Sequence, residues 1–125
     1  LYNNLKIGID NFRYSLLNQE FKKIGFDAFE IKNIKLIRPN DILKVSPIIN
    51  SVFVNHNFVW GDSPILRWYT NNTKKIINNG NISYGKIEPN YRKTDGFMAM
   101  VNCMILAQTE IKERIKAPKV GVLTF

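Results

Sequence analysis

The pattern of apolar and polar positions along the chain predicts strands and helices in alternation. Segment 5–9 alternates and is rich in β-branched residues, which predicts a short strand. Apolar residues then recur at helical spacing over 12–24, and Gly25 follows as a helix terminator. A second strand is predicted over 33–37 and is ended by Pro39.

The middle of the chain predicts two further helices. The first begins at Asn40 or Asp41, either of which is a good cap, and reaches about Phe53. Because Pro47 lies within it, we expect a kink or a break there. The second covers segment 63–71, which opens with a Ser-Pro pair typical of helix starts.

Two β-like runs, 73–77 and 82–87, flank the dipeptide Asn79-Gly80, which predicts a β-hairpin. The order strand, helix, strand, helix, helix, hairpin, helix indicates an α/β fold with at least two parallel strands. Two strands and a hairpin make a thin mixed sheet for so many apolar helices. We therefore expect neighbouring strands to be supplied by residues before Leu1.

The stretch 86–107 changes from basic and polar to almost wholly apolar. The run 97–107 has one polar side chain, so we expect a helix that is buried on most sides. It is too short to span a membrane, which takes roughly 20 apolar residues. Asp95 lies where the basic loop enters this helix, so it is either a helix cap or a ligand that the core holds rigidly.

Length and composition fit a single globular domain. The 125 residues are 45% hydrophobic, which predicts one domain over 1–125 with 117–125 as a tail. Cys103 is the one cysteine, which excludes an intramolecular disulfide and favours a reducing compartment. No stretch is typical of a signal peptide or a transmembrane helix.

The formal charge of +8 favours a polyanionic partner, most often nucleic acid. The alternative is that the lysines reflect an A/T-rich genome, because Asn, Ile and Lys, which are abundant here, are encoded by A/T-rich codons. The lysines occur singly or in pairs and never form a long run.

Asp10 and Asp95 are the candidate metal ligands. Asp10 follows a predicted strand, and ligands gather at the carboxyl ends of strands in open α/β sheets. The alternative for Asp10 is a helix cap, because a helix begins next. Oxygen ligands suit Mg²⁺ or Mn²⁺, and a pair of such ions cleaves phosphodiesters. A site of this kind usually needs a third carboxylate.

Other side chains give weaker signals. His56 is the one histidine, and it is either a general base or a partner of a helix C-terminus. Zinc is excluded as a cofactor because no second His or Cys is present to complete a site. Four aromatic residues near basic ones either stack on bases or belong to the core: Trp60, Trp68, Tyr69 and Tyr91.

Three stretches follow one another in a distinctive order. The first, IGIDNFR (7–13), is the end of a predicted strand with the acid Asp10. The second, SPILRWYTNN (63–72), is a predicted helix with Trp68 and, four residues later, Asn72. NGNISYGK (79–86) and RKTDGFMA (92–99) join a hairpin, basic residues and a final acid. This set resembles the C-terminal part of the nuclease domain in large terminase subunits of tailed bacteriophages. The likeness covers roughly residues 5–107.

The resemblance implies a partial ribonuclease H-like fold and metal-dependent cutting of concatemeric double-stranded viral DNA. It makes Asp10 and Asp95 catalytic carboxylates that bind Mg²⁺ or Mn²⁺, and it makes Lys86, Arg92 and Lys93 the DNA-binding residues. The family's first active-site acid and its ATPase domain would lie upstream of this sequence. It also implies portal and small-terminase partners, no membrane, and action in the bacterial host cytoplasm.

Three alternatives to this function remain open. The first is a non-catalytic nucleic-acid-binding module, the second is another ribonuclease H-like nuclease such as a junction resolvase, and the third is a purely structural role in assembly. The first alternative predicts DNA binding that is independent of Asp10 and Asp95. The second predicts a preference for branched over linear DNA.

Overall fold

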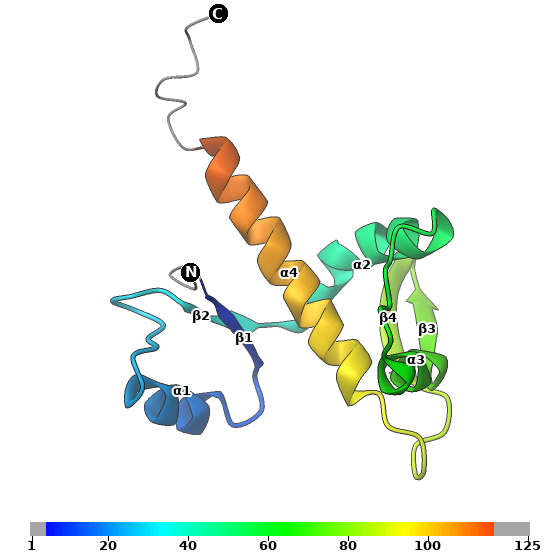
Figure 1. Cartoon of the computed structure of the whole chain (residues 1–125), viewed down its shortest axis with the longest axis horizontal. Coiled ribbons are helices and arrows are strands. Elements are labelled where there is room, and N and C mark those ends of the chain that lie inside the picture. Colours follow the sequence, from blue (N-terminus) through cyan, green and yellow to red (C-terminus); the bar gives the residue numbers. More distant parts are fainter. Residues whose placement is uncertain (1–4, 117–125) are drawn as a thin grey trace, which may run out of the picture.

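The computed structural model describes residues 5–116 and the side chains of residues 5–109. Within this part, four helices and two small sheets form a mixed α/β arrangement (Figure 1). The predicted tail, 117–125, lies outside the described residues. In chain order the elements are β1 (Ile7–Asp10), α1 (Tyr14–Lys22), β2 (Ile34–Ile37), α2 (Pro39–Val54), α3 (Pro64–Asn71), β3 (Thr73–Asn78), β4 (Asn81–Lys86) and α4 (Asp95–Lys116).

The predicted order of strands and helices is confirmed, and so is the parallel pair. β1 pairs with β2 in parallel, from Ile7 opposite Ile34 to Asp10 opposite Ile37. The hairpin joins β3 and β4 through Asn79 and Gly80, whose φ angles are 49° and 79°. Positive φ at both turn positions is the geometry that Asn-Gly favours in tight hairpins.

The expectation of one thin mixed sheet is wrong for the described residues. β1–β2 and β3–β4 are separate two-stranded sheets. Figure 1 shows why: α4 lies between them, with the parallel pair on one side and the hairpin on the other. Side chains of this helix fill the space that a shared strand edge would need.

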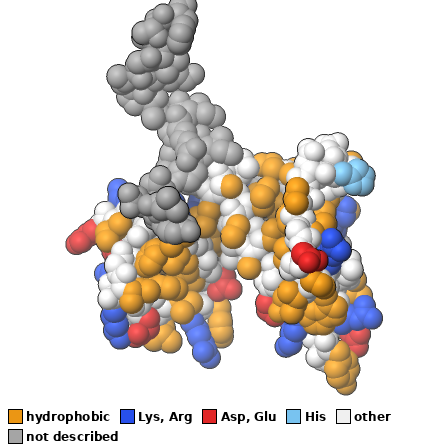
Figure 2. All heavy atoms as spheres, viewed as in Figure 1, with side chains coloured by type: hydrophobic (Ala, Val, Ile, Leu, Met, Phe, Trp, Pro, Cys, Tyr) orange, Lys and Arg blue, Asp and Glu red, His pale blue; other side chains and the backbone are white. Residues whose placement is uncertain are grey.

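Helix α4 joins two lobes. The N-terminal lobe comprises β1, α1 and β2, and the hairpin lobe comprises α2, α3, β3 and β4. α4 contacts α2 and α3 on one side and both parallel strands on the other. Figure 2 shows the surface hollowed between the lobes, at the end of the molecule where α4 begins.

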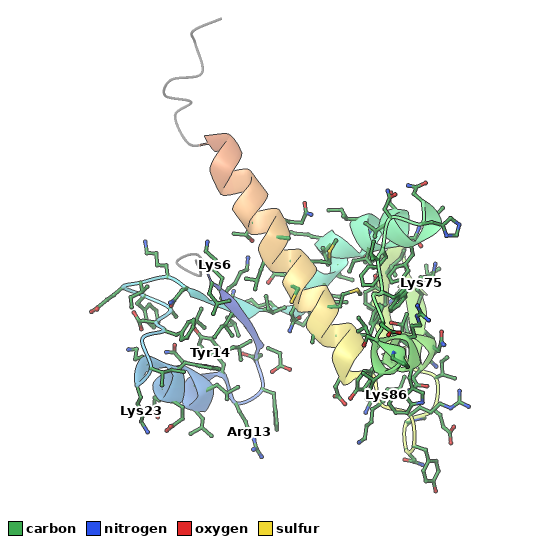
Figure 3. All side chains as sticks on the ribbon, viewed as in Figure 1. Lys6, Arg13, Tyr14, Lys23, Lys75 and Lys86 are labelled. Carbon is green, nitrogen blue, oxygen red and sulfur yellow. The ribbon has the colours of Figure 1, made fainter. Side chains whose placement is uncertain are left out.

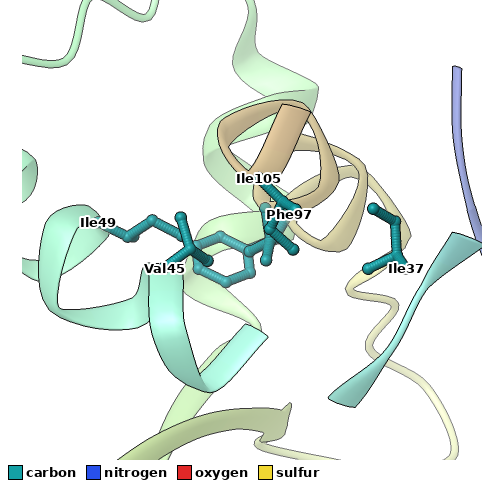
Figure 4. Packing of buried hydrophobic residues seen from close by; sticks show 6 residues of the cluster. Ile37, Val45, Ile49, Phe97 and Ile105 are labelled. Carbon is teal, nitrogen blue, oxygen red and sulfur yellow. The ribbon is translucent and has the colours of Figure 1, made fainter. Parts of the chain in front are cut away.

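The main part of the core is an apolar cluster centred on α4, and the buried Ile9 and Ile34 lie outside it. Phe97, Val101 and Ile105 recur every four residues and form a buried stripe. Figure 4 shows Val45 and Ile49 of α2 on one side of this stripe and Ile37 of β2 on the other. Burial of each such side chain contributes about 1.5–3 kcal/mol, so this contact holds the two lobes together.

The expectation that residues 97–107 are buried on most sides is wrong. Ala99 and Cys103 are exposed, whereas the Phe97–Val101–Ile105 stripe is buried. The described elements that pack on α4 cover only part of its circumference. The apolar composition of the run therefore overstates its burial.

The loop before β2 is fixed by Asp27, which is buried. Its Oδ2 accepts hydrogen bonds from the N–H groups of Phe29 and Glu30, and its own N–H donates to Asn33 Oδ1. The Glu30 N–H lowers the pKa of Asp27 most strongly, against burial, and Lys22 Nζ assists at 3.3 Å. These bonds position Asn33 directly before the second strand.

Helix α2 continues through Pro47, so the helix is not broken there, and Ser46 explains how. Pro47 has no N–H to donate to the carbonyl of Leu43, four residues earlier. The hydroxyl of Ser46, which is fully buried, donates to that carbonyl at 3.1 Å. Because an unpaired backbone carbonyl away from water is costly, and Leu43 is partly buried, Ser46 replaces the bond that the proline removes.

We expect Ser46→Ala to lower the free energy of unfolding by about 1–2 kcal/mol, because it leaves the Leu43 carbonyl unpaired. In a Pro47→Ala background the same change should have a much smaller effect, since the restored N–H at position 47 reaches that carbonyl. Urea denaturation of the four variants measures this coupling. Ser51→Ala, on the exposed side of α2, is the matched control, because it removes only a solvent-exposed hydrogen bond from Asn55 Nδ2. Equal losses in both backgrounds would contradict the assignment.

Candidate functional site

Asp10 is the last residue of β1 and is exposed. Side chains alternate along a strand, so Asp10 shares the face of Gly8. A Cβ atom placed on Gly8 would lie 3.4 Å from Leu106 Cδ1, so this face is the one that packs on α4. Asp10 therefore lies on the α4 side of the parallel pair, at its carboxyl end.

The alternative assignment of Asp10 as a helix cap is wrong. The residue that precedes α1 is Arg13, which has a φ of 58°. Asp10 Oδ1 instead accepts a hydrogen bond from the N–H of Phe12 at 3.1 Å, which closes a local turn. This bond occupies one carboxylate oxygen and fixes the direction of the other.

Asp95 is the first residue of α4 and is also exposed. The carbonyl of the buried Thr94 accepts the N–H of Met98 at 3.0 Å, so the helical bonding begins directly before Asp95. Asp95 is thus held by the first turn of the helix around which the core is built. A carboxylate at this position is also stabilised by the helix dipole.

The three basic candidates lie on the path from the hairpin to α4. Lys86 is the last residue of β4, and Figure 3 shows it at the end of the molecule where α4 begins. Arg92 and Lys93 follow in the connecting loop 87–94, and both are exposed. Arg92 Nε lies 3.5 Å from Glu88 Oε2, a surface ion pair that contributes little to stability.

The structure brings the two acids to the same end of the molecule without joining them. Gly8 packs beside Leu106, which lies about 16 Å along the helix from Asp95, and Asp10 lies about 7 Å further along the strand from Gly8. Measured along the axis of α4, Asp10 and Asp95 are therefore roughly 10 Å apart. Among the described side chains, no three His, Cys, Asp or Glu residues gather closely enough to hold a metal ion.

The chemistry of these residues suits a hard cation and a phosphate. Asp10 retains a second carboxylate oxygen, and Asp95 contributes oxygen ligands of the type that Mg²⁺ and Mn²⁺ prefer. The ammonium groups of Lys86 and Lys93 can contact phosphate oxygens. Figure 2 shows acidic side chains on both sides of the hollow between the lobes.

Asn72 is the residue that connects these parts, and sequence reasoning gave it no structural role. It is 3% exposed, directly after α3. Its Nδ2 donates to the carbonyl of Lys93 at 3.0 Å, and its own carbonyl accepts the N–H of Ile87 at 2.9 Å. Asn72 therefore holds both ends of loop 87–94, which carries Arg92 and leads into Asp95. The sequence marks Asn72 only as the Asn four residues after Trp68, and its partners Ile87 and Lys93 lie too far along the chain for a local pattern to indicate them.

Gly96 lets the first turn of α4 approach α3 closely. A Cβ atom at Gly96 would overlap the ring of Tyr69, with its Cγ at 2.9 Å. No side chain larger than hydrogen fits there unless the ring moves. The glycine that follows Asp95 is thus explained by this contact.

The remaining candidates are placed as follows. Trp60 is half-buried and packs with Phe53 and Phe58 in an aromatic cluster beside the core. Trp68 is 44% exposed with its ring against Tyr69, and Tyr91 is 78% exposed beside Arg92. His56 is exposed, just beyond the C-terminal end of α2.

Comparisons of this chain with family models, with curated proteins and with solved structures give no match. Over the described residues, every helix is too short or too polar to cross a membrane.

We expect Asn72→Asp to lower the free energy of unfolding by about 3 kcal/mol, because a carboxylate cannot donate to the Lys93 carbonyl and is itself buried. Amide hydrogen exchange at Lys93 and Gly96 should accelerate more than in the α2 core. The neighbouring Asn71→Asp, at an exposed position, is the matched control. A loss no larger than that of the control would show that the clamp is unimportant.

We expect Gly96→Ala to destabilise the protein by about 1–3 kcal/mol through overlap with the Tyr69 ring. In a Tyr69→Ala background the same change should stabilise by up to about 1 kcal/mol, because alanine favours a helix over glycine. Thermal or urea unfolding of the four variants checks this change of sign. Stabilisation in both backgrounds would mean that the ring moves aside freely.

Proposed function

We propose that this chain is the C-terminal part of the nuclease domain of a phage terminase large subunit, with a partial ribonuclease H-like fold. The observation that carries the proposal is the placement of Asp10 and Asp95. One lies at the carboxyl end of β1 on the α4 side, and the other is the first residue of α4. Both are exposed at the same end of the molecule.

In this proposal Asp10 and Asp95 hold Mg²⁺ or Mn²⁺. A divalent cation bound there would neutralise the charge that develops on the scissile phosphate. The Phe12 N–H orients the Asp10 carboxylate, and the first turn of α4 orients that of Asp95. The resemblance assigns a third acid to an upstream strand, which would complete the ligand set.

The basic residues hold the DNA. Lys86 and Lys93 contact backbone phosphates, and Arg92 exchanges its surface pair with Glu88 for a phosphate oxygen. The hydrogen bond from Asn72 to the Lys93 carbonyl fixes the position of this loop next to Asp95. The substrate would be concatemeric double-stranded DNA in the bacterial host cytoplasm, with the portal and the small terminase subunit as partners of the intact protein.

A second candidate is a non-catalytic nucleic-acid-binding module, which the net charge of +8 favours. It uses the same basic loop and assigns no role to the two acids. It predicts salt-sensitive DNA binding that is unchanged by replacement of either acid. A junction resolvase shares the acids and differs in its preference for branched DNA.

We expect Asp10→Asn and Asp95→Asn each to abolish DNA cutting by the intact protein while the fold persists. Asparagine keeps the acceptor for the Phe12 N–H and removes only the charge. The exposed Asp62→Asn is the matched control and should cut normally. Agarose gels of linear and branched duplex with Mg²⁺ or Mn²⁺ provide the measurement. Full cutting by either site variant would reject the assignment.

A second readout is independent of cutting. Mn²⁺ added to the 125-residue chain should broaden the NMR signals of Asn11 and Gly96 together, and Asp10→Asn should weaken the broadening at both. If Mn²⁺ never broadens both signals, the two acids do not share a site and the assignment is rejected.

A further inference from the structure

A groove in the hairpin lobe lies outside the candidate nuclease site. It has a volume of about 170 Å³ and runs between α2, the end of α3 and the hairpin. Its apolar surface is formed by Ile49, Phe53, Tyr84 and Phe97. We call it the hairpin groove.

The walls of the groove are aromatic and rigid. The rings of Tyr84 and Phe97 meet edge to face with their centroids 4.9 Å apart. Phe97 is part of the buried stripe of α4, so its ring cannot turn away. Burial raises the pKa of the Tyr84 hydroxyl, as expected where water is partly excluded. A preformed apolar hollow of about this size accepts a benzene-sized group.

The rim of the groove is positive. Lys75 pairs with Tyr84 across the hairpin, so the two side chains lie on the same face of it. Lys75 Nζ donates to Asn50 Oδ1 at 3.0 Å, which holds the ammonium at the mouth (Figure 3). Among the described residues that line the groove, Lys74 and Lys75 carry charge and none is acidic.

The two threonine hydroxyls in the walls are already engaged, which favours an apolar occupant. The hydroxyl of Thr70 donates to the carbonyl of Leu66, and that of Thr73 donates to the carbonyl of Tyr69. A nucleotide base placed here would bury hydrogen-bonding atoms that these side chains cannot satisfy. An apolar amino-acid side chain has no such atoms.

We propose that the hairpin groove binds an acidic segment of a partner protein, which inserts one aromatic side chain and pairs a flanking carboxylate with Lys75. The volume fits one aromatic ring, and the rim supplies the complementary charge. Such a segment anchors through its buried ring, and the ion pair fixes its direction. The proposal does not depend on metal binding at Asp10 or Asp95.

The test uses the ¹⁵N-labelled 125-residue chain and a synthetic pentapeptide, acetyl-Asp-Glu-Phe-Glu-Asp-amide. We expect the peptide to shift the amide signals of Asn50, Thr73 and Tyr84. Replacing its Phe by Ala should weaken binding about tenfold or more, because the anchor is lost. Lys75→Glu should weaken it about fivefold to tenfold.

Lys44→Glu changes the net charge equally on an exposed part of α2, and it should leave the affinity within about twofold. Circular dichroism and thermal unfolding verify that both variants fold. The proposal is overturned if the Ala peptide binds as well as the Phe peptide, if both lysine variants weaken binding equally, or if the groove signals do not move. It is also overturned if a short oligothymidylate shifts those signals and the peptide does not.

Discussion

The buried stripe of α4 is the contact on which the rest of the structure depends. Phe97, Val101 and Ile105 fill the space between α2 and the parallel strands, and each sheet has only two strands. An isolated two-stranded sheet is marginal in water, so each gains its stability from this helix. The lobes are therefore coupled, and the first turn of α4 has a fixed position relative to both.

That fixed first turn gives the candidate site its geometry. Gly96 brings the helix against Tyr69, and Asn72 ties the preceding loop to the end of α3. Asp95 and the basic loop are thus attached to the core by two independent contacts. Asp10 depends on the same core from the other lobe, through the packing of β1 on α4. The distance between the two acids is therefore set by how both lobes pack on α4.

The groove in the hairpin lobe serves a different kind of contact. Its walls include Phe97, which also belongs to the core, so an occupant would touch the element that positions Asp95. Binding there adds an interface to a lobe whose other exposed apolar residues, such as Ile76 and Ile77, are scattered on the hairpin. A charged rim around one apolar hollow gives direction to such an interface.

The sequence by itself determined the local structure: the strand and helix order, the Asn-Gly turn, and both acids at element ends all follow from patterns within a few residues. These features depend on backbone preferences and short-range spacing, which a sequence displays directly. Only the tertiary structure decided that the strands form two sheets, that Ala99 and Cys103 face outward, and that Asn72 clamps the loop. Each of these depends on which segments meet across α4, and residues far apart in the chain carry no local signal of their contact.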